Sequence, residues 1–196
     1  MSAGEPAPVA VLLSGTGTNA EVLIRAGQQP GSPYRVMLAV SNNPGAGGLA
    51  RAEQLGVSTL AIDHRPYGRD REAHERAIDA DLRGAGVQWI ALAGYMRVLT
   101  PWLVNAWSGR MLNIHPSLLP AFPGLHTHAR ALEAGVPVHG CTVHLVTEGV
   151  DEGPVLGQAE VPVLPGDTPD TLAARVQIAE HTLYPATLAK AVLAAD

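Results

Sequence analysis

An asparagine and a histidine stand two residues apart in the segment Leu112-Asn113-Ile114-His115-Pro116. Because alternate residues of an extended segment point to the same side, we expect the Asn113 amide and the His115 imidazole to project together. An amide donor beside a titratable ring suits the stabilisation of negative charge on a carbonyl oxygen under attack. Prolines at three positions between residues 116 and 123 stiffen the backbone that follows. The alternative is that both side chains bond only to loop backbone, so the pair needs support from elsewhere in the chain.

A second group, Gly15-Thr16-Gly17-Thr18-Asn19-Ala20, lies between an apolar run and a segment with helical periodicity. Two glycines at such a junction let backbone N–H groups approach an anion at the positive end of the helix, so a phosphate is the natural ligand. The loop also fits the dinucleotide pattern G-x-G-x-x-A, but that pattern needs an acidic residue about 20 positions on to hold a ribose. No Asp or Glu occurs between Glu21 and Glu53. The sequence therefore favours a phosphate over a dinucleotide, with a purely steric role of the glycines as the alternative.

An acidic turn, Val150-Asp151-Glu152-Gly153-Pro154, separates two segments that are predicted to be strands. A lone aspartate in a turn usually bonds only to its own turn. Asp151 gains a catalytic role if the fold brings it to His115, which the spacing alone does not show. His144, on the strand before the turn, is interpreted as a histidine that serves the sheet.

Three more histidines, His126, His128 and His139, could suggest zinc together with Asp151. Their spacings match no standard zinc pattern, and the single cysteine, Cys141, is isolated, so we predict no metal site. A lone cysteine cannot form an internal disulfide. This fits a reducing compartment, and we expect a cytoplasmic location.

The elements that must position these residues alternate in type along the chain. Continuous apolar runs rich in branched residues are typical of buried strands, and segments with helical spacing lie between them. The strands are expected at residues 9–14, 34–41, 57–62 and 88–93, and the helices at residues 18–26, 46–55 and 71–83. Buried strands that alternate with helices imply a parallel sheet covered on both faces. The sequence thus predicts an α/β fold with a Rossmann-like, mostly parallel sheet.

The pattern changes after Thr100. We expect a short helix to Trp107, a strand over residues 110–114, a loop over 115–125 and a helix over 127–134. A strand pair at residues 140–147 and 154–163 and a long final helix from Thr168 or Thr171 to about Leu193 complete the prediction. With neither linker nor internal repeat in sight, we expect a single domain over residues 1–196.

Composition and charge exclude several classes of function. The chain has 196 residues, of which 46% are apolar and 16% are charged, as is typical of a globular protein. Thirteen Lys and Arg against eighteen Asp and Glu leave a net charge of -5, so we expect no nucleic-acid partner. The chain starts without a signal-peptide pattern, and no run approaches the roughly 18 apolar residues of a membrane helix. We expect small-molecule partners and no membrane, with the oligomeric state open and a dimer among the options.

Together these segments resemble the phosphoribosylglycinamide formyltransferase family over nearly the whole chain. The motifs that carry the likeness are Leu13 to Asn19, Leu92 to Arg97, Leu112 to Pro120, Phe122 to His128 and Ala179 to His181. The stretch from residue 112 to residue 128 is highly specific. The resemblance implies transfer of a formyl group from 10-formyltetrahydrofolate to the glycinamide amine of a phosphorylated ribose in purine biosynthesis, without a metal. It also implies an N-terminal half that binds the ribonucleotide and a C-terminal half that binds the folate and performs catalysis.

The same resemblance implies a role for each matched residue. The catalytic group corresponds to Asn113, His115 and Asp151. The phosphate loop corresponds to Gly17, Thr18 and Asn19, and the groups that hold the ribose correspond to Gln177 and Glu180. The folate contacts correspond to Arg71, Met96, Arg97, Val98, Leu99 and Asn113.

The chain departs from the family in two places. The stretch Asn43-Pro44-Gly45-Ala46-Gly47-Gly48 is richer in glycine than is usual, and Thr18 stands where serine is common. The threonine keeps the hydroxyl group. The glycines leave the shape of that edge of the pocket open.

The chemistry of the matched residues agrees with the implied reaction. A neutral amine that attacks a formyl carbonyl creates negative charge on oxygen and positive charge on nitrogen. Asn113 and a protonated His115 would stabilise the oxygen, each well-placed donor contributing about 3 to 4 kcal/mol. Asp151 would keep His115 protonated and relay a proton through a water. Two alternatives stay open: hydrolysis of the formyl folate, and a non-catalytic module that binds a nucleotide or a phosphate.

Overall fold

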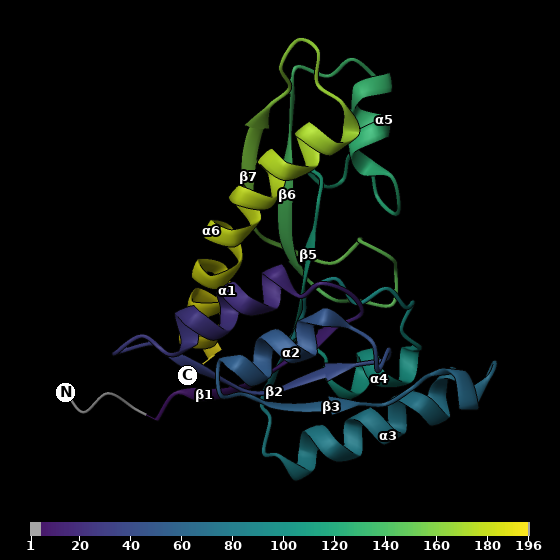
Figure 1. The fold of residues 1–196 in the computed structure, drawn as a ribbon, viewed down its shortest axis with the longest axis vertical. Helices are drawn as coiled ribbons and strands as arrows, with labels where there is room; N and C mark the ends of the chain where they lie inside the picture. Colours follow the sequence, from purple (N-terminus) through teal and green to yellow (C-terminus); the bar gives the residue numbers. More distant parts are fainter. Residues whose placement is uncertain (1–4, 196) are drawn as a thin grey trace.

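The structure, a computed structural model, describes residues 5–195. Within that range seven strands form one sheet in the order β3-β2-β1-β4-β5-β6-β7 (Figure 1). The strands are β1 (Ala7–Leu13), β2 (Tyr34–Ser41), β3 (Ser58–Ala61), β4 (Trp89–Leu92), β5 (Met111–His115), β6 (Val138–Leu145) and β7 (Val155–Pro162). Neighbours from β3 to β5 pair in parallel, and β6 pairs antiparallel with both β5 and β7. The predicted mostly parallel sheet with a C-terminal strand pair is confirmed.

Helices cover both faces of this sheet. They are α1 (Thr18–Gly27), α2 (Gly47–Gln54), α3 (Arg71–Gly84), α4 (Pro101–Ala106), α5 (Thr127–Glu133) and α6 (Pro169–Ala195), with a short 3-10 helix, η1, at Arg65–Tyr67. The last helix, α6, continues through Pro185. None of the helices in residues 5–195 combines the length and the apolar character needed to cross a membrane.

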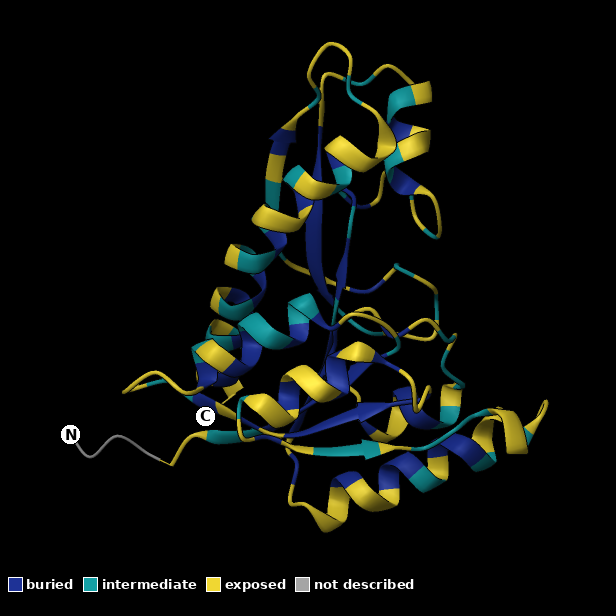
Figure 2. Ribbon diagram, in the orientation of Figure 1, coloured by how far each residue is buried: buried dark blue, intermediate teal, exposed yellow. Residues whose placement is uncertain are grey.

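Alternate side chains of β1 enter two separate cores. Val9, Val11 and Leu13 pack with residues of α1, α2 and α6, whereas Ala10 and Leu12 pack with residues of α3 and α4. All five side chains are completely buried, and Figure 2 shows the central strands buried between helices whose outer faces are exposed. A continuous apolar run therefore means a strand with helices on both sides, as expected.

The long helix α6 also fixes the ends of two strands. Tyr184 is fully buried, and its hydroxyl oxygen lies 3.0 Å from the Leu92 carbonyl oxygen and 3.1 Å from that of Leu112. Burial raises the pKa of Tyr184 well above its usual value, so the hydroxyl keeps the proton that it donates. Since Leu92 and Leu112 immediately precede Ala93 and Asn113 of the candidate site, α6 fixes the carboxyl end of β4 and the part of β5 next to Asn113.

Candidate active site

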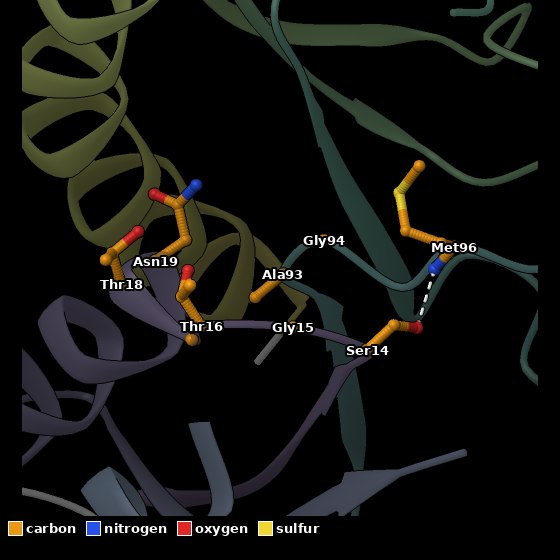
Figure 3. Close-up of a pocket in the computed structure, with 9 residues that line it drawn as sticks. Ser14, Gly15, Thr16, Thr18, Asn19, Ala93, Gly94 and Met96 are labelled. Atoms are coloured by element: carbon orange, nitrogen blue, oxygen red, sulfur yellow. Dashed lines mark hydrogen bonds between the residues drawn. The ribbon is translucent and has the colours of Figure 1, made fainter. Parts of the chain in front are cut away.

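The candidate site lies where β1, β4 and β5 end. In the sheet β1 stands between β2 and β4. The chain runs from β1 to β2 on one side and returns from β3 to β4 on the other, so the strand order reverses between β1 and β4. Open α/β sheets bind their ligands at such a point. A pocket of about 370 Å³ opens at this point, lined by residues 14–19 together with Ala93, Gly94 and Met96 (Figure 3). The loop after β1 and the segment after β4 thus form opposite sides of one pocket.

The loop after β1 presents the first turn of α1 without a side-chain cap. Gly17 precedes the helix with a φ of 75°, a left-handed conformation that suits glycine, and it has no side chain with which to bond the helix amides. Its carbonyl oxygen accepts a hydrogen bond from Glu21 N at 2.9 Å. The amides of the first turn are therefore available to an anion in the pocket.

Two residues of α6 reach this loop from the far end of the chain. Gln177 Nε2 donates to Thr18 Oγ1 at 3.0 Å, and Asn19 Nδ2 donates to Glu180 Oε2 at 2.9 Å. Burial raises the pKa of Glu180, and the hydrogen bond from Asn19 opposes this effect. The structure thus brings the residues matched to the ribose beside the residues matched to the phosphate.

The segment after β4 is held by side chains from two other elements. Met96 N donates to Ser14 Oγ at 2.8 Å, and Arg71 Nη1 donates to the Val98 carbonyl oxygen at 3.1 Å. Thr100 bonds through both its amide and its hydroxyl to Glu75, a carboxylate that is 3% exposed.

Five of the matched folate contacts, Arg71, Met96, Arg97, Val98 and Leu99, lie on or against this held segment, whereas Asn113 lies in β5. The side chains of Met96 and Val98 remain 67% and 57% exposed, whereas Arg97 and Leu99 are partly buried. The segment therefore offers apolar surface to a ligand while its backbone stays fixed. Neither Ser14 nor Glu75 was anticipated from the sequence.

The three residues matched to catalysis converge although Asp151 comes from a distant turn. The Nδ1 atom of His115 lies 3.3 Å from Asp151 Oδ2, and both side chains are nearly buried. The Nε2 atom of His115 lies 3.0 Å from the Phe122 carbonyl oxygen. Both ring nitrogens face acceptors, an arrangement that a doubly protonated imidazolium satisfies. A substrate oxygen bound at Nε2 must replace the Phe122 carbonyl.

His144 lies between Asn113 and Asp151, which the sequence did not indicate. Its Nε2 is 3.2 Å from Asn113 Nδ2 and 3.6 Å from Asp151 Oδ1. Because its Nδ1 lies 2.9 Å from the Leu145 carbonyl oxygen, which only accepts, the proton of a neutral ring belongs on Nδ1. Nε2 is then the acceptor for the Asn113 amide and fixes which way that amide points. The cause is the register of the antiparallel pair, in which Asn113 stands directly opposite His144.

The carboxylate of Asp151 is kept ionised by its neighbours. Burial alone raises its pKa, but the adjacent His144 ring, the hydrogen bond from the Gly124 amide and the nearby His115 together lower the pKa below its usual value. The Gly124 N–H donates to Oδ2 at 2.8 Å. Asp151 also has a φ of 59°, in the left-handed region that costs a non-glycine residue about 1 to 3 kcal/mol. Such strain is typical of a residue held for function.

The remaining histidines form no metal site in the described part of the chain. No group of three or more His, Cys, Asp or Glu side chains within residues 5–195 could hold a metal ion. His128 and His139 instead pack edge to face, with ring centres 5.3 Å apart. Burial and the neighbouring His128 lower the pKa of His139 to about 4, so both rings contact one another as neutral groups at physiological pH.

Comparison with known proteins agrees with this geometry. Residues 7–188 match the protein family described as formyl transferase. The chain belongs to that family.

Within the family the chain is similar to phosphoribosylglycinamide formyltransferase of Escherichia coli (strain K12), at 44% identity over 90% of this chain and 83% of that one. A crystal structure of phosphoribosylglycinamide formyltransferase from Brucella melitensis superposes with a TM-score of 0.92 at 53% identity, covering 96% of both chains. The trifunctional purine biosynthetic protein adenosine-3 of Gallus gallus is 51% identical over 92% of this chain. This chain spans only 18% of the length of that relative.

Proposed function

We propose that the chain transfers the formyl group of 10-formyltetrahydrofolate to the amine of 5-phosphoribosylglycinamide. The products are formylglycinamide ribonucleotide and tetrahydrofolate, formed in de novo purine biosynthesis. The observation that carries the proposal is the convergence of Asn113, His115 and Asp151 beside a pocket formed by the Gly15–Asn19 loop and the segment after β4. The family match and the similarity to phosphoribosylglycinamide formyltransferases support it.

The phosphate of the ribonucleotide binds at the first turn of α1, against Gly17, Thr18 and Asn19. Backbone amides there supply donors without the desolvation cost of a buried cation. Gln177 and Glu180 hold the ribose, since both already bond to side chains of this loop. The N-terminal half of the chain thus binds the phosphate, with α6 supplying the ribose contacts.

The folate binds against Met96, Arg97, Val98 and Leu99, with Arg71 beside them. Apolar walls with a few polar anchors are typical of sites for small heterocycles. Asn113 lies at the end of the neighbouring strand and contacts both the heterocycle and the formyl group. A folate analogue should therefore protect residues 95–99 from amide hydrogen exchange, and unchanged exchange there would place the folate elsewhere.

Catalysis rests on charge stabilisation and proton movement. Attack of the substrate amine on the formyl carbon forms a C–N bond and places negative charge on the formyl oxygen. The Asn113 amide and the His115 imidazolium donate hydrogen bonds to that oxygen. Asp151 stabilises the imidazolium and accepts, through a water, the proton that the amine must lose; the proton then passes to the folate nitrogen as the C–N bond to the folate breaks.

The test is to mix purified protein with 10-formyltetrahydrofolate, with and without 5-phosphoribosylglycinamide, and to follow deformylation. We expect turnover only when the ribonucleotide is present, with one formylated ribonucleotide per folate consumed. Equal release of formate without the ribonucleotide would show a hydrolase. Binding of both ligands without turnover would show a non-catalytic module.

A further inference from the structure

The first turn of α2 touches the phosphate loop through backbone atoms. The Gly48 N–H donates a hydrogen bond to the Gly15 carbonyl oxygen at 3.0 Å. A Cβ atom on Gly48 would lie 2.9 Å from Gly17 Cα and 2.8 Å from a terminal methyl of Leu13. A Cβ atom on Gly17 would in turn overlap Gly48 Cα. The two glycines therefore face each other at a distance that admits no side chain on either.

This requirement belongs to Gly48 and not to the glycine-rich stretch as a whole. A Cβ atom on the adjacent Gly47 would have no heavy atom within 4 Å. Gly48 lies within α2 and is not among the described glycines with a positive φ, so its backbone conformation does not demand glycine. Its missing side chain serves the close approach of two backbones.

We propose that Gly48 is a positioning residue for the phosphate of the ribonucleotide, because α2 sets the curvature of the loop that binds it. The inference rests on the proposed function and assigns part of phosphate recognition to an element outside the loop. The Gly48 amide, one of the first-turn donors of α2, holds Gly15 at the start of the loop, and the Gly48 Cα supports Gly17 directly before α1.

A methyl group at position 48 would have to move the loop. The Leu13 methyl groups are the flexible end of a side chain, although they are completely buried. The Gly17 Cα is backbone at the start of α1 and shifts only if the helix amides shift with it. Several converging donors must sit within about 0.5 Å of their productive positions, so a small displacement weakens all of them at once.

The experiment compares Gly48→Ala with the matched control Gly47→Ala. Steady-state kinetics would give KM for the ribonucleotide and for the formyl folate, and calorimetry would give the Kd of inorganic phosphate. For Gly48→Ala we expect KM of the ribonucleotide and Kd of phosphate to rise about tenfold or more, with KM of the folate within about twofold of wild type. For Gly47→Ala we expect every value within about twofold.

The outcomes separate this inference from the proposed function. If the wild type transfers no formyl group, the proposed function fails, and the effect of Gly48→Ala on phosphate binding still decides the inference. An unchanged Kd for phosphate in Gly48→Ala overturns the inference. So does an equal rise of both KM values, or the same loss in Gly47→Ala, because each of these indicates general damage.

A measurement on the wild type covers the case in which Gly48→Ala does not fold. Amide hydrogen exchange of Gly48 is followed with and without inorganic phosphate. Because its N–H is bonded to Gly15, phosphate that rigidifies the loop should slow exchange at Gly48. Exchange that stays unchanged at Gly48 while the amides of residues 17–19 are protected would overturn the inference.

Discussion

The two segments that line the pocket are held in different ways. The Gly15–Asn19 loop is held by backbone contact, with Gly17 pressed against Gly48 and Gly15 bonded to its amide. The segment after β4 is held by side chains, with Ser14, Arg71 and Glu75 bonding to backbone groups of residues 96, 98 and 100. Both arrangements fix a backbone, the first through the missing side chains of two glycines and the second through side chains that bond to backbone groups.

This difference predicts how each segment responds to mutation. A backbone contact tolerates no added atom, so a single Cβ should have a large effect. A hydrogen bond can be removed or replaced singly, so its loss should have a graded effect of about 1 to 3 kcal/mol where a buried group is left without a partner. His115 and Asp151, which are matched to catalysis alone, belong to neither segment and should affect kcat and not binding.

The largest effect is expected for Asp151→Asn, which tests whether catalysis is separate from both binding segments. The variant keeps the shape of the side chain but removes the charge that stabilises the His115 imidazolium. We expect kcat to fall about 10²-fold or more, while both KM values stay near those of the wild type. Steady-state kinetics with both substrates measure this, and NMR titration of the His115 ring checks the cause.

A near-normal kcat with an unchanged titration of His115 would make Asp151 an ordinary turn residue. His144→Gln is a useful companion, because His144 lies against Asp151 and orients Asn113 without facing the formyl oxygen itself. Its kcat should fall less than that of Asp151→Asn.

The next effect in size is expected for Gly17→Val, which tests the backbone contact between Gly17 and Gly48. The valine Cβ would overlap Gly48 Cα. The valine would also have to adopt the φ of 75° seen at Gly17, a conformation that a β-branched residue strongly resists. We expect KM of the ribonucleotide to rise about 30-fold, corresponding to about 2 kcal/mol of lost binding, with a much smaller change for the folate. Equal weakening of both substrates, with the fold intact by circular dichroism, would argue against a phosphate loop.

Sequence periodicity predicted the elements of the fold well. The run from Val9 to Ser14 predicts a buried strand, since it is apolar throughout, rich in branched residues and too short for a buried helix. The glycines after it have to be a tight turn before a helix. The pattern also predicted the strand pair at the C-terminal end and the long last helix. The first and last residues of these elements differ slightly from the prediction, because hydrophobic periodicity does not show where an element is capped.

Contacts between distant elements could not be predicted in the same way. His144 was interpreted as a sheet residue because periodicity gives a strand but not its register with β5, and that register places it opposite Asn113. The bond between Thr100 and Glu75 depends on where α3 crosses the sheet. The residues matched through family resemblance were found without this information, which is why Gln177 and Glu180 were named and Glu75 was missed.

A smaller effect is expected for Glu75→Ala, which tests the side-chain hydrogen bonds that hold the segment after β4. The variant leaves the Thr100 amide without its buried acceptor and loosens the segment after β4. We expect KM of the folate to rise about fivefold to tenfold, with KM of the ribonucleotide unchanged. Glu75→Gln is the matched control, since its amide can accept from Thr100 N and donate to the hydroxyl, and it should restore most of the affinity. Equal values for Ala and Gln would show that Glu75 does not hold the segment.

The smallest effect concerns the packing of His139 against the segment after β5, which is held neither by the glycine contact nor by the side chains described above. His139 is 1% exposed and packs against His128 and Phe122. Burial lowers its pKa, and the Pro116 backbone group opposes this effect only in part. Its pKa falls from 6.5 in the unfolded chain to about 4 in the folded one. Between these values the unfolded chain binds more protons, so acid favours unfolding. The stabilisation is fully present above pH 6.5 and is lost as the pH falls toward 4.

Thermal unfolding at a series of pH values tests this. We expect the melting temperature of the wild type to fall across this window, and His139→Leu to reduce the fall by roughly 3 °C or more, because leucine takes up no proton. His126→Asn is the control, since His126 is exposed and asparagine tolerates its φ of 57°. A slope in His139→Leu as steep as that of the wild type would assign the acid sensitivity to another group. A flatter slope would show that the neutral His139 imidazole stabilises the segment after β5 that contains Pro116 and Phe122, a third way of holding a segment of this site.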